Sequence, residues 1–197
     1  MDIQLHKAAA ADDAAAIKTL LASGADIDTR DGSGATPLLV ATHDNRVNAA
    51  RALIEAGADV NAKDAISDSP YLYAGARGHL DILKLTLAHG ADLGSVNRYG
   101  GTALIPAAER GHVETVATLI EAGADVDHVN RLGWTALLEA IILGDGGPRH
   151  VEIVALLIAG GTHVELADND GVSPLRHARD RGYGAIAALL EKAGAKR

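Results

Sequence analysis

The chain has 197 residues, no cysteine, no phenylalanine and a formal net charge of −8 at neutral pH. The lack of cysteine excludes disulfides and thiolate metal sites, and the negative charge, with no run of Lys or Arg longer than two, excludes the basic surface needed to bind a nucleic-acid backbone. Because the N-terminus lacks a cationic start and no apolar stretch approaches the roughly 20 residues of a membrane span, we expect a cytoplasmic protein that binds neither nucleic acid nor membrane.

The first predicted repeat, residues 1–30, consists of two helices without the loop that precedes the helices of later repeats. Its first helix begins directly at Leu5, and Gln4, Lys7 and Asp13 supply a polar outer face. Polar outer faces on terminal repeats keep an open-ended stack of repeats soluble. The segment is therefore predicted to be an N-terminal capping repeat.

Three further repeats follow at a fixed interval over residues 31–129. Gly24, Gly57, Gly90 and Gly123 are spaced 33 residues apart, and each is followed ten residues later by a second small residue, Gly or Ser. A constant interval of this length is the signature of stacked structural repeats. The predicted boundaries of these repeats are 31–63, 64–96 and 97–129.

Each repeat carries start and stop signals for two helices. Candidate N-cap residues begin the first helix at Thr36, Ser69, Thr102, Thr135 and Ser173. In three repeats proline follows at the first helical position, where its missing N–H does no harm. The second helix has apolar residues at helical spacing and ends at the repeating glycine, which suits left-handed dihedral angles. We expect the remaining segment to run extended to a turn and back.

The fifth repeat, residues 130–167, is longer than the others. Its closing Gly161 lies 38 residues after Gly123, and the surplus five residues are 145–149. Because Gly146-Gly147-Pro148 cannot continue a helix, we expect this insertion to loop out, either extending a contact surface or as a tolerated surface insertion. The sixth repeat, 168–197, returns to the regular interval and carries charged residues suited to a C-terminal cap, so we expect a complete stack.

The period and its motifs resemble the ankyrin repeat family. Thr36-Pro37-Leu38, Gly78-His79 and Gly111-His112 stand where that family has them, as do the recurring Gly-Ala-Asp triplets. Asp12-Asp13 and Asn45-Arg46 depart from the Gly-His pattern, and Ser67 replaces a glycine at the tip of a loop. The chain also looks like the small stand-alone ankyrin repeat proteins of bacteria.

The resemblance implies an all-α repeat fold and a single ankyrin repeat domain over residues 1–197. That domain is an ankyrin solenoid of six stacked helix-turn-helix units with β-hairpin fingers. The resemblance further implies a non-catalytic protein–protein interaction module, an adaptor or an inhibitor, that binds a protein partner. No cofactor is implied.

Residues that recur in every repeat are assigned to the scaffold. Asp26, Asp59, Asp92 and Asp125 are interpreted as loop hydrogen-bonding groups, and the recurring His79 and His112 as ties at the turn between helices. Asn61 is interpreted as a structural turn residue. The chain contains no His-Glu-x-x-His, Gly-x-x-x-x-Gly-Lys or Gly-x-Ser-x-Gly motif. The sequence therefore predicts no catalytic residue and no metal site.

Residues that break the pattern at exposed positions are the better functional candidates. Such positions are the finger tips and the outer ends of the first helices, which line the predicted concave face. In repeats four and five they carry aromatic, arginine and large aliphatic side chains, the types in which interface energy concentrates. The predicted partner-binding residues are Arg98, Tyr99, Arg110, Arg131, Leu132, Trp134, Ile142 and Leu143.

Several alternatives stay open from the sequence alone. Trp134 suits packing against a neighbouring finger, and Ile142 and Leu143 suit a local core under the insertion. Arg98 and Arg131 suit surface pairs with acidic neighbours.

Two other classes of function are also considered. Glu139, Asp145 and His150 flank the insertion and suit a cation or small-molecule site. Self-association through Ile142 and Leu143 is the third class, although a monomer is the default expectation.

Overall fold

Apolar residues at helical spacing fold this chain into helices throughout. The computed structural model describes residues 3–196, and within that range the chain forms twelve α-helices and no β-strand. The helices are α1 (Gln4–Ala10), α2 (Ala14–Ala22), α3 (Pro37–His43), α4 (Val47–Glu55), α5 (Pro70–Arg77), α6 (Leu80–Ala88), α7 (Leu104–Glu109), α8 (Val113–Glu121), α9 (Ala136–Ile142), α10 (Pro148–Ala159), α11 (Pro174–Asp180) and α12 (Gly184–Lys192).

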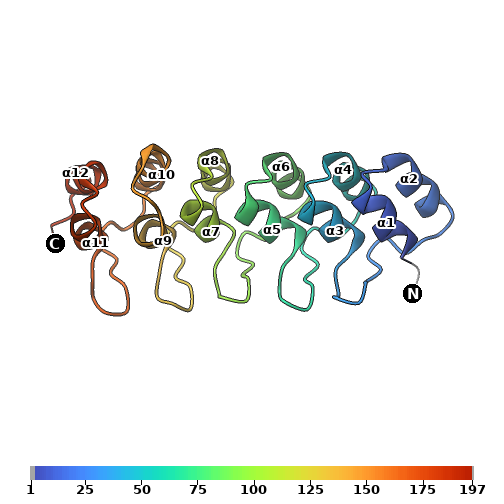
Figure 1. Cartoon of the computed structure of the whole chain (residues 1–197), viewed down its shortest axis with the longest axis horizontal. Coiled ribbons are helices and arrows are strands. Elements are labelled where there is room, and N and C mark those ends of the chain that lie inside the picture. The colour runs from blue at the N-terminus through green and yellow to red at the C-terminus, as the bar shows by residue number, and fades with distance from the viewer. Residues whose placement is uncertain (1–2, 197) are drawn as a thin grey trace. The chain divides into compact units, whose positions relative to one another are not determined.

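The chain divides into two compact units. The N-terminal unit runs to Gly75 and includes His79–Arg98, and the C-terminal unit comprises Ala76–Gly78 and the chain from Tyr99 onward. Within each unit the odd-numbered helices form one layer and the even-numbered helices form a second (Figure 1). In the N-terminal unit α1 packs on α3, and α4 packs between α2 and α6. In the C-terminal unit α9 packs between α7 and α11, and α10 packs between α8 and α12.

Each unit is therefore a stretch of an all-helical solenoid, with its core between the two layers. Every predicted repeat contains two helices, but the exact boundaries between repeats stay a prediction, and residues 1–2 and 197 lie outside the described range. None of the helices in the described range is long and apolar enough to cross a membrane.

The predicted N-caps form in four of the five cases. The side-chain oxygens of Thr36, Ser69, Thr135 and Ser173 each accept the backbone N–H three residues ahead at 3.2 Å. A cap of this kind satisfies one of the orphan donors of the first helical turn, and it stabilises the helix by about 1 kcal/mol. These four residues therefore fix where the first-layer helices begin.

Thr102 is the exception, and the predicted cap at this position is wrong. Its hydroxyl is buried without a hydrogen-bond partner, and α7 begins at Leu104 after Ala103. The cause is Pro106. In the equivalent place of the third repeat, the N–H of Tyr73 donates to the carbonyl of Ser69 at 2.8 Å, and proline has no N–H to make that bond. The first turn of α7 is lost, and its cap is lost with it.

The fingers are tight turns rather than the predicted β-hairpins. In the second repeat the N–H of Asp31 donates to the carbonyl of Ala35 at 3.0 Å, and the N–H of Gly34 donates back to Asp31 at 3.1 Å. The Asp31 carboxylate also accepts the N–H groups of Ser33 and Ala35. The Asp31 side chain therefore closes this turn, in place of a ladder of backbone bonds between two paired strands. Residues 31–35 accordingly form a turn and not a β-hairpin.

Three residues that replace a glycine of the repeat pattern keep the left-handed backbone conformation of that glycine. Asp12, Asn45 and Ser67 have φ angles of 57°, 51° and 67°, in the left-handed region. Asp12 has a second role, because its carboxylate accepts the N–H of Ala49 at 2.7 Å. The side chain therefore compensates for part of the cost of a left-handed non-glycine residue.

The recurring polar residues belong to the scaffold, as the sequence indicates. Asp26, Asp59, Asp92 and Asp125 each accept the N–H two residues ahead. The Asn61 side chain donates to the carbonyl of Gly90 at 2.9 Å and accepts the N–H of Asp92 at 2.9 Å. His79 bonds the Thr42 carbonyl in α3 at 2.9 Å, so it ties two successive repeats together.

Candidate partner-binding surface

The finger of the fifth repeat, Asn130–Trp134, is built around the Asn130 side chain. Its Oδ1 accepts the N–H groups of Leu132 at 2.9 Å and Trp134 at 3.1 Å, and its backbone N–H donates to the Trp134 carbonyl at 3.0 Å. Asp64 and Asp168 make the same pair of side-chain bonds in the third and sixth repeats. The fifth finger is therefore a side-chain-closed turn that points Leu132 outward.

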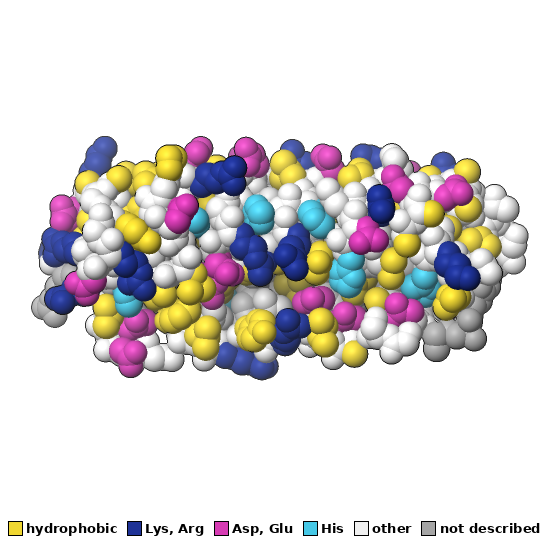
Figure 2. All heavy atoms as spheres, viewed as in Figure 1, with side chains coloured by type: hydrophobic (Ala, Val, Ile, Leu, Met, Phe, Trp, Pro, Cys, Tyr) yellow, Lys and Arg dark blue, Asp and Glu magenta, His cyan; other side chains and the backbone are white. Residues whose placement is uncertain are grey.

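Three large hydrophobic side chains of the C-terminal unit are more than half exposed. Tyr99 has 58%, Leu132 53% and Leu143 51% of its surface accessible to solvent. Figure 2 shows hydrophobic side chains over the loops that precede α7 and α9, with Lys or Arg side chains beside them. Exposed apolar area of this kind favours association, because covering it removes apolar surface from water.

Trp134 and Ile142 are half-buried. Part of each side chain therefore packs against the scaffold and part faces solvent. Neither residue is wholly structural or wholly exposed. Val129, directly before the fifth finger, is 46% exposed and is absent from the predicted set. A β-branched residue there gives no signal in the repeat pattern, because nothing in the motif separates an exposed valine from a buried one.

The predicted residues form two groups at opposite ends of the first-layer helices. The finger group contains Tyr99, Arg131, Leu132 and Trp134. The N–H of Arg131 donates to the Tyr99 carbonyl at 3.0 Å, and the Arg131 stem lies so close to Gly100 that a Cβ there would lie 2.9 Å from its Cγ. Neighbouring fingers are therefore joined directly.

The helix-end group contains Arg110, Ile142 and Leu143, at the C-terminal ends of α7 and α9. The Arg110 guanidinium donates to the Ala76 carbonyl at 2.7 Å, which fixes its position. Because α9 has 7 residues, the length of one short helix, about 10 Å, separates the two groups. Arg98 is exposed but belongs to the N-terminal unit.

The insertion is only partly a loop, which narrows the sequence expectation: residues 145–147 are not helical, whereas residues 148–149 belong to α10. Pro148 occupies the first turn of α10, and this helix has 12 residues where α8 and α12 have 9. Residues 148–149 therefore lengthen the helix, in agreement with the tolerance for proline at a helix start. The preceding residues are packed down, since the Tyr183 hydroxyl donates to the Gly144 carbonyl at 3.0 Å.

His150 connects this short loop to the preceding repeat. Its Nδ1 lies 2.7 Å from Oδ1 of Asp145, and its Nε2 lies 2.9 Å from the Glu109 carbonyl. The imidazole is almost entirely buried, whereas 80% of the Asp145 side chain is exposed. The role of His150 is therefore structural.

Glu139, Asp145 and His150 do not form the cation site that their positions beside the insertion suggest. No group of three His, Asp or Glu side chains within residues 3–196 is placed to hold a metal ion. Glu139 is instead buried in α9 with 6% of its surface exposed, and its Oε1 accepts a hydrogen bond of 2.7 Å from Nδ2 of Asn130. Burial, together with the Glu109 charge, raises the pKa of the Glu139 carboxyl to about 7.

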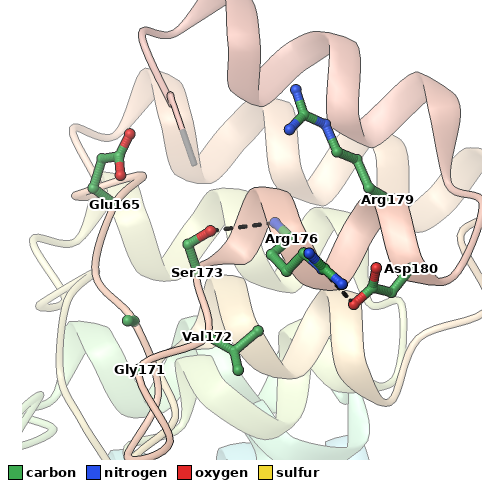
Figure 3. A pocket seen from close by; sticks show the side chains of 8 residues that line it. Glu165, Gly171, Val172, Ser173, Arg176, Arg179 and Asp180 are labelled. Carbon is green, nitrogen blue, oxygen red and sulfur yellow. Dashed lines mark hydrogen bonds and ion pairs between the residues drawn. The ribbon is translucent and has the colours of Figure 1, made fainter.

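Two hollows lie on the outermost helix pairs, away from the predicted residues. The larger, of about 690 Å³, is lined by Ser173, Arg176, Arg179 and Asp180, among others (Figure 3). Its arginines are already paired, Arg176 with Asp180 at 2.7 Å and Arg179 with Glu191 at 2.6 Å. The other is lined by residues of α1 and α2. The arginines of the larger hollow are therefore not free to hold an anion.

Comparison with known proteins gives one consistent family. Residues 3–64 and 71–147 match the family described as ankyrin repeats (3 copies). An ankyrin repeat domain from Acinetobacter baumannii AYE has a similar solved structure, with 65% identity, coverage of 98% of this chain and 99% of that one, and a TM-score of 0.96. The ankyrin repeat domain of Bcl-3 is 28% identical, with coverage of 99% and 87% and a TM-score of 0.88.

A curated relative matches over a shorter segment. The ankyrin repeat protein YahD of Escherichia coli (strain K12) is 49% identical over 57 residues, which is 29% of this chain. The matched segment spans 28% of the length of YahD.

Proposed function

Because this chain belongs to the ankyrin repeat family, we propose that it is a non-catalytic protein-binding module, an adaptor or inhibitor, that holds a partner against repeats four and five. The observation that carries the proposal is the exposure of Tyr99, Leu132 and Leu143, each by more than half. Covering these apolar side chains removes their surface from water, which favours association.

The two groups have different parts in this proposal. In the finger group, Tyr99 and Leu132 are the apolar anchors, and Arg131 is a polar contact beside them. In the helix-end group, Leu143 is the anchor, Ile142 extends its apolar area, and Arg110 is the polar contact. Anchors of these residue types dominate interface energies, and the polar rim fixes orientation. A partner segment of about 10 Å or more bridges both groups along α9.

The test is affinity capture with a double variant, Leu132→Asp with Leu143→Asp. Ile66→Asp is the matched control, because Ile66 occupies the finger-tip position in the third repeat and is 50% exposed. The proposal expects the double variant to lose specific proteins from a lysate of the native host, as identified by mass spectrometry, while Ile66→Asp retains them. An identical set of proteins captured by all three chains contradicts it.

Self-association is separated from this proposal by light scattering over a range of protein concentrations. If the wild-type chain is a dimer and the double variant is a monomer, the exposed residues serve a second copy of the chain. A monomer at all concentrations leaves these residues for a different partner.

A further inference from the structure

The Asn130 carboxamide joins the fifth finger to a buried carboxyl group. Its Oδ1 faces two backbone N–H donors, those of Leu132 and Trp134, so the orientation of the amide is determined and its Nδ2 must face Glu139. The Nδ2 to Oε1 distance is 2.7 Å. A single side chain thus holds the tip of the finger with one end and α9 with the other.

Glu139 is unusual for its place in the repeat. The equivalent positions in the second, third and fourth repeats are Val40, Tyr73 and Pro106, none of which carries a charge near neutral pH. In the sixth repeat the equivalent pair is Asp168 and His177, joined at 2.7 Å between Oδ2 and Nε2. The first repeat has Lys7 at this position, so a carboxyl group stands here in the fifth repeat alone, where it lies beneath the proposed partner-binding surface.

The charged groups that act on Glu139 come from α7 and its end. Glu109 opposes ionisation of the Glu139 carboxyl and Arg110 favours it, while burial opposes it most strongly, so its pKa rises to about 7. The titratable groups on the other neighbours of α9 are engaged elsewhere. His150 of α10 bonds Asp145, and His177 of α11 bonds Asp168. The finger itself carries Arg131 and, just before it, His128, whose Nε2 lies 2.7 Å from the Gly100 carbonyl.

We propose that Glu139 is a proton-linked positioning residue, whose protonation loosens Asn130 and with it the finger that presents Leu132 and Trp134. The physical basis is the difference between a hydrogen bond to a carboxylate and one to a neutral carboxyl, since the charged acceptor makes the stronger bond. In the ionised state Asn130 is held firmly, and the finger is ordered. In the protonated state the same bond is weaker, and the two N–H groups on Oδ1 open more often.

The proposal rests on the proposed function only for the use of the finger in partner binding. The linkage between Glu139 and the finger is a property of the isolated chain. It can therefore be tested without a partner, and the two ideas fail separately.

The reporter is Trp134, which is the single tryptophan of the chain and lies at the end of the finger. Its fluorescence is recorded from pH 5 to pH 9 in the full chain. The wild type is expected to show a transition with a midpoint near pH 7. Glu139→Gln, which keeps an acceptor for Asn130 but cannot ionise, is expected to show none. Glu109→Gln removes the opposing charge and is expected to lower the midpoint, whereas His128→Gln is expected to leave it unchanged.

Amide hydrogen exchange supplies the second measurement. Wild type and Glu139→Gln are compared at the same pH, so that intrinsic exchange rates cancel. At pH 8 the Leu132 and Trp134 amides are expected to exchange about fivefold faster in Glu139→Gln, and at pH 6 the two chains are expected to agree. A purely structural role for Glu139 gives the same ratio at both values.

Each outcome decides the question. A flat wild-type fluorescence curve, a transition that survives in Glu139→Gln, or one that disappears in His128→Gln overturns the inference. A transition that Glu139→Gln removes and Glu109→Gln shifts to lower pH supports it. If the transition behaves in this way and the Leu132 and Leu143 variant still captures the same proteins, the linkage stands and the proposed binding surface fails.

Discussion

His150 and Glu109, which are 41 residues apart in sequence, are joined by a hydrogen bond of 2.9 Å between the imidazole Nε2 and the backbone carbonyl. This bond anchors the start of α10 to the end of α7. It also occupies a carbonyl at the C-terminal end of a helix, where no backbone donor is available.

His150→Ala is expected to lower the free energy of unfolding by about 2 kcal/mol, because it leaves the Glu109 carbonyl unsatisfied and opens a cavity. Urea unfolding followed by circular dichroism measures the loss. His163→Ala is the control, since 83% of the His163 side chain is exposed, and it is expected to change stability by less than about 0.5 kcal/mol. Equal losses in the two variants contradict the structural role of His150.

Glu139→Gln is expected to alter the dependence of stability on pH. The pKa of this carboxyl is about 7 in the folded chain, against 4.5 for an unperturbed glutamate. Between these values the unfolded chain ionises first, so wild-type stability falls as pH rises from 4.5 to 7 and the loss is complete above 7. At pH 8 the variant is expected to be more stable by on the order of 3 kcal/mol, and at pH 4.5 the two chains are expected to agree.

Urea titrations at several pH values between 4.5 and 8 measure this effect. Glu121→Gln, which removes an exposed carboxyl from α8, should run parallel to the wild type. A constant offset between wild type and Glu139→Gln at all pH values contradicts the raised pKa. At pH 8, Glu139→Gln is expected to raise the free energy of unfolding, because it removes a buried charge. The same variant is expected to lower the protection of the finger amides from exchange, because its bond to Asn130 is weaker.

The same Thr→Val substitution is expected to have different effects at two equivalent positions. Thr135→Val removes an N-cap bond of 3.2 Å, and it is expected to cost about 1 kcal/mol. Thr102→Val removes a buried hydroxyl that has no partner, and it is expected to be neutral or stabilising. Thermal unfolding of both variants provides the comparison. A loss in Thr102→Val as large as that in Thr135→Val contradicts the absence of an N-cap bond at Thr102.

Tyr183→Phe is expected to loosen the loop at 144–147, because its hydroxyl holds the Gly144 carbonyl at 3.0 Å. The expected cost is about 1 kcal/mol. Gly146→Ala is expected to cost more, since the residue has a φ of 67° and a Cβ there collides with the Tyr183 ring. Limited proteolysis at the loop checks both variants, and a loop equally resistant to cleavage in the wild type and in Gly146→Ala is the contrary result.

The repeat register, the helix pairs and four of the five caps follow from the sequence because they are local. An interval of 33 residues, a Thr or Ser before Pro, and a glycine after an apolar run each specify backbone geometry within a few residues. The cap at Thr102 fails for an equally local reason, Pro106 four residues ahead, so this error was avoidable from the sequence. The family resemblance implies β-hairpin fingers. The recurring Asp or Asn at the base of each finger instead indicates a turn that a side chain can close.

The insertion and Glu139 could not be assigned in this way. Gly146-Gly147-Pro148 is compatible both with a projecting loop and with the start of a helix, and the contact with Tyr183, more than thirty residues later, decides between them. Glu139, Asp145 and His150 all lie near the insertion in sequence, and this nearness alone suggests a common site. Nearness along the chain does not show which way a helical side chain faces. The bond between Glu139 and Asn130 also depends on how the fifth finger folds back onto α9.

The turn that a side chain closes in the second, third, fifth and sixth repeats has a consequence for how new targets are acquired. Ile66, Leu132 and Asp170 occupy the tip of equivalent turns, and each joins the turn through its backbone N–H. Since closure does not depend on which side chain stands there, point mutations at a tip can change what is recognised while the backbone is preserved. The fingers are accordingly natural positions for randomised libraries, in which selection acts on specificity with little penalty in folding.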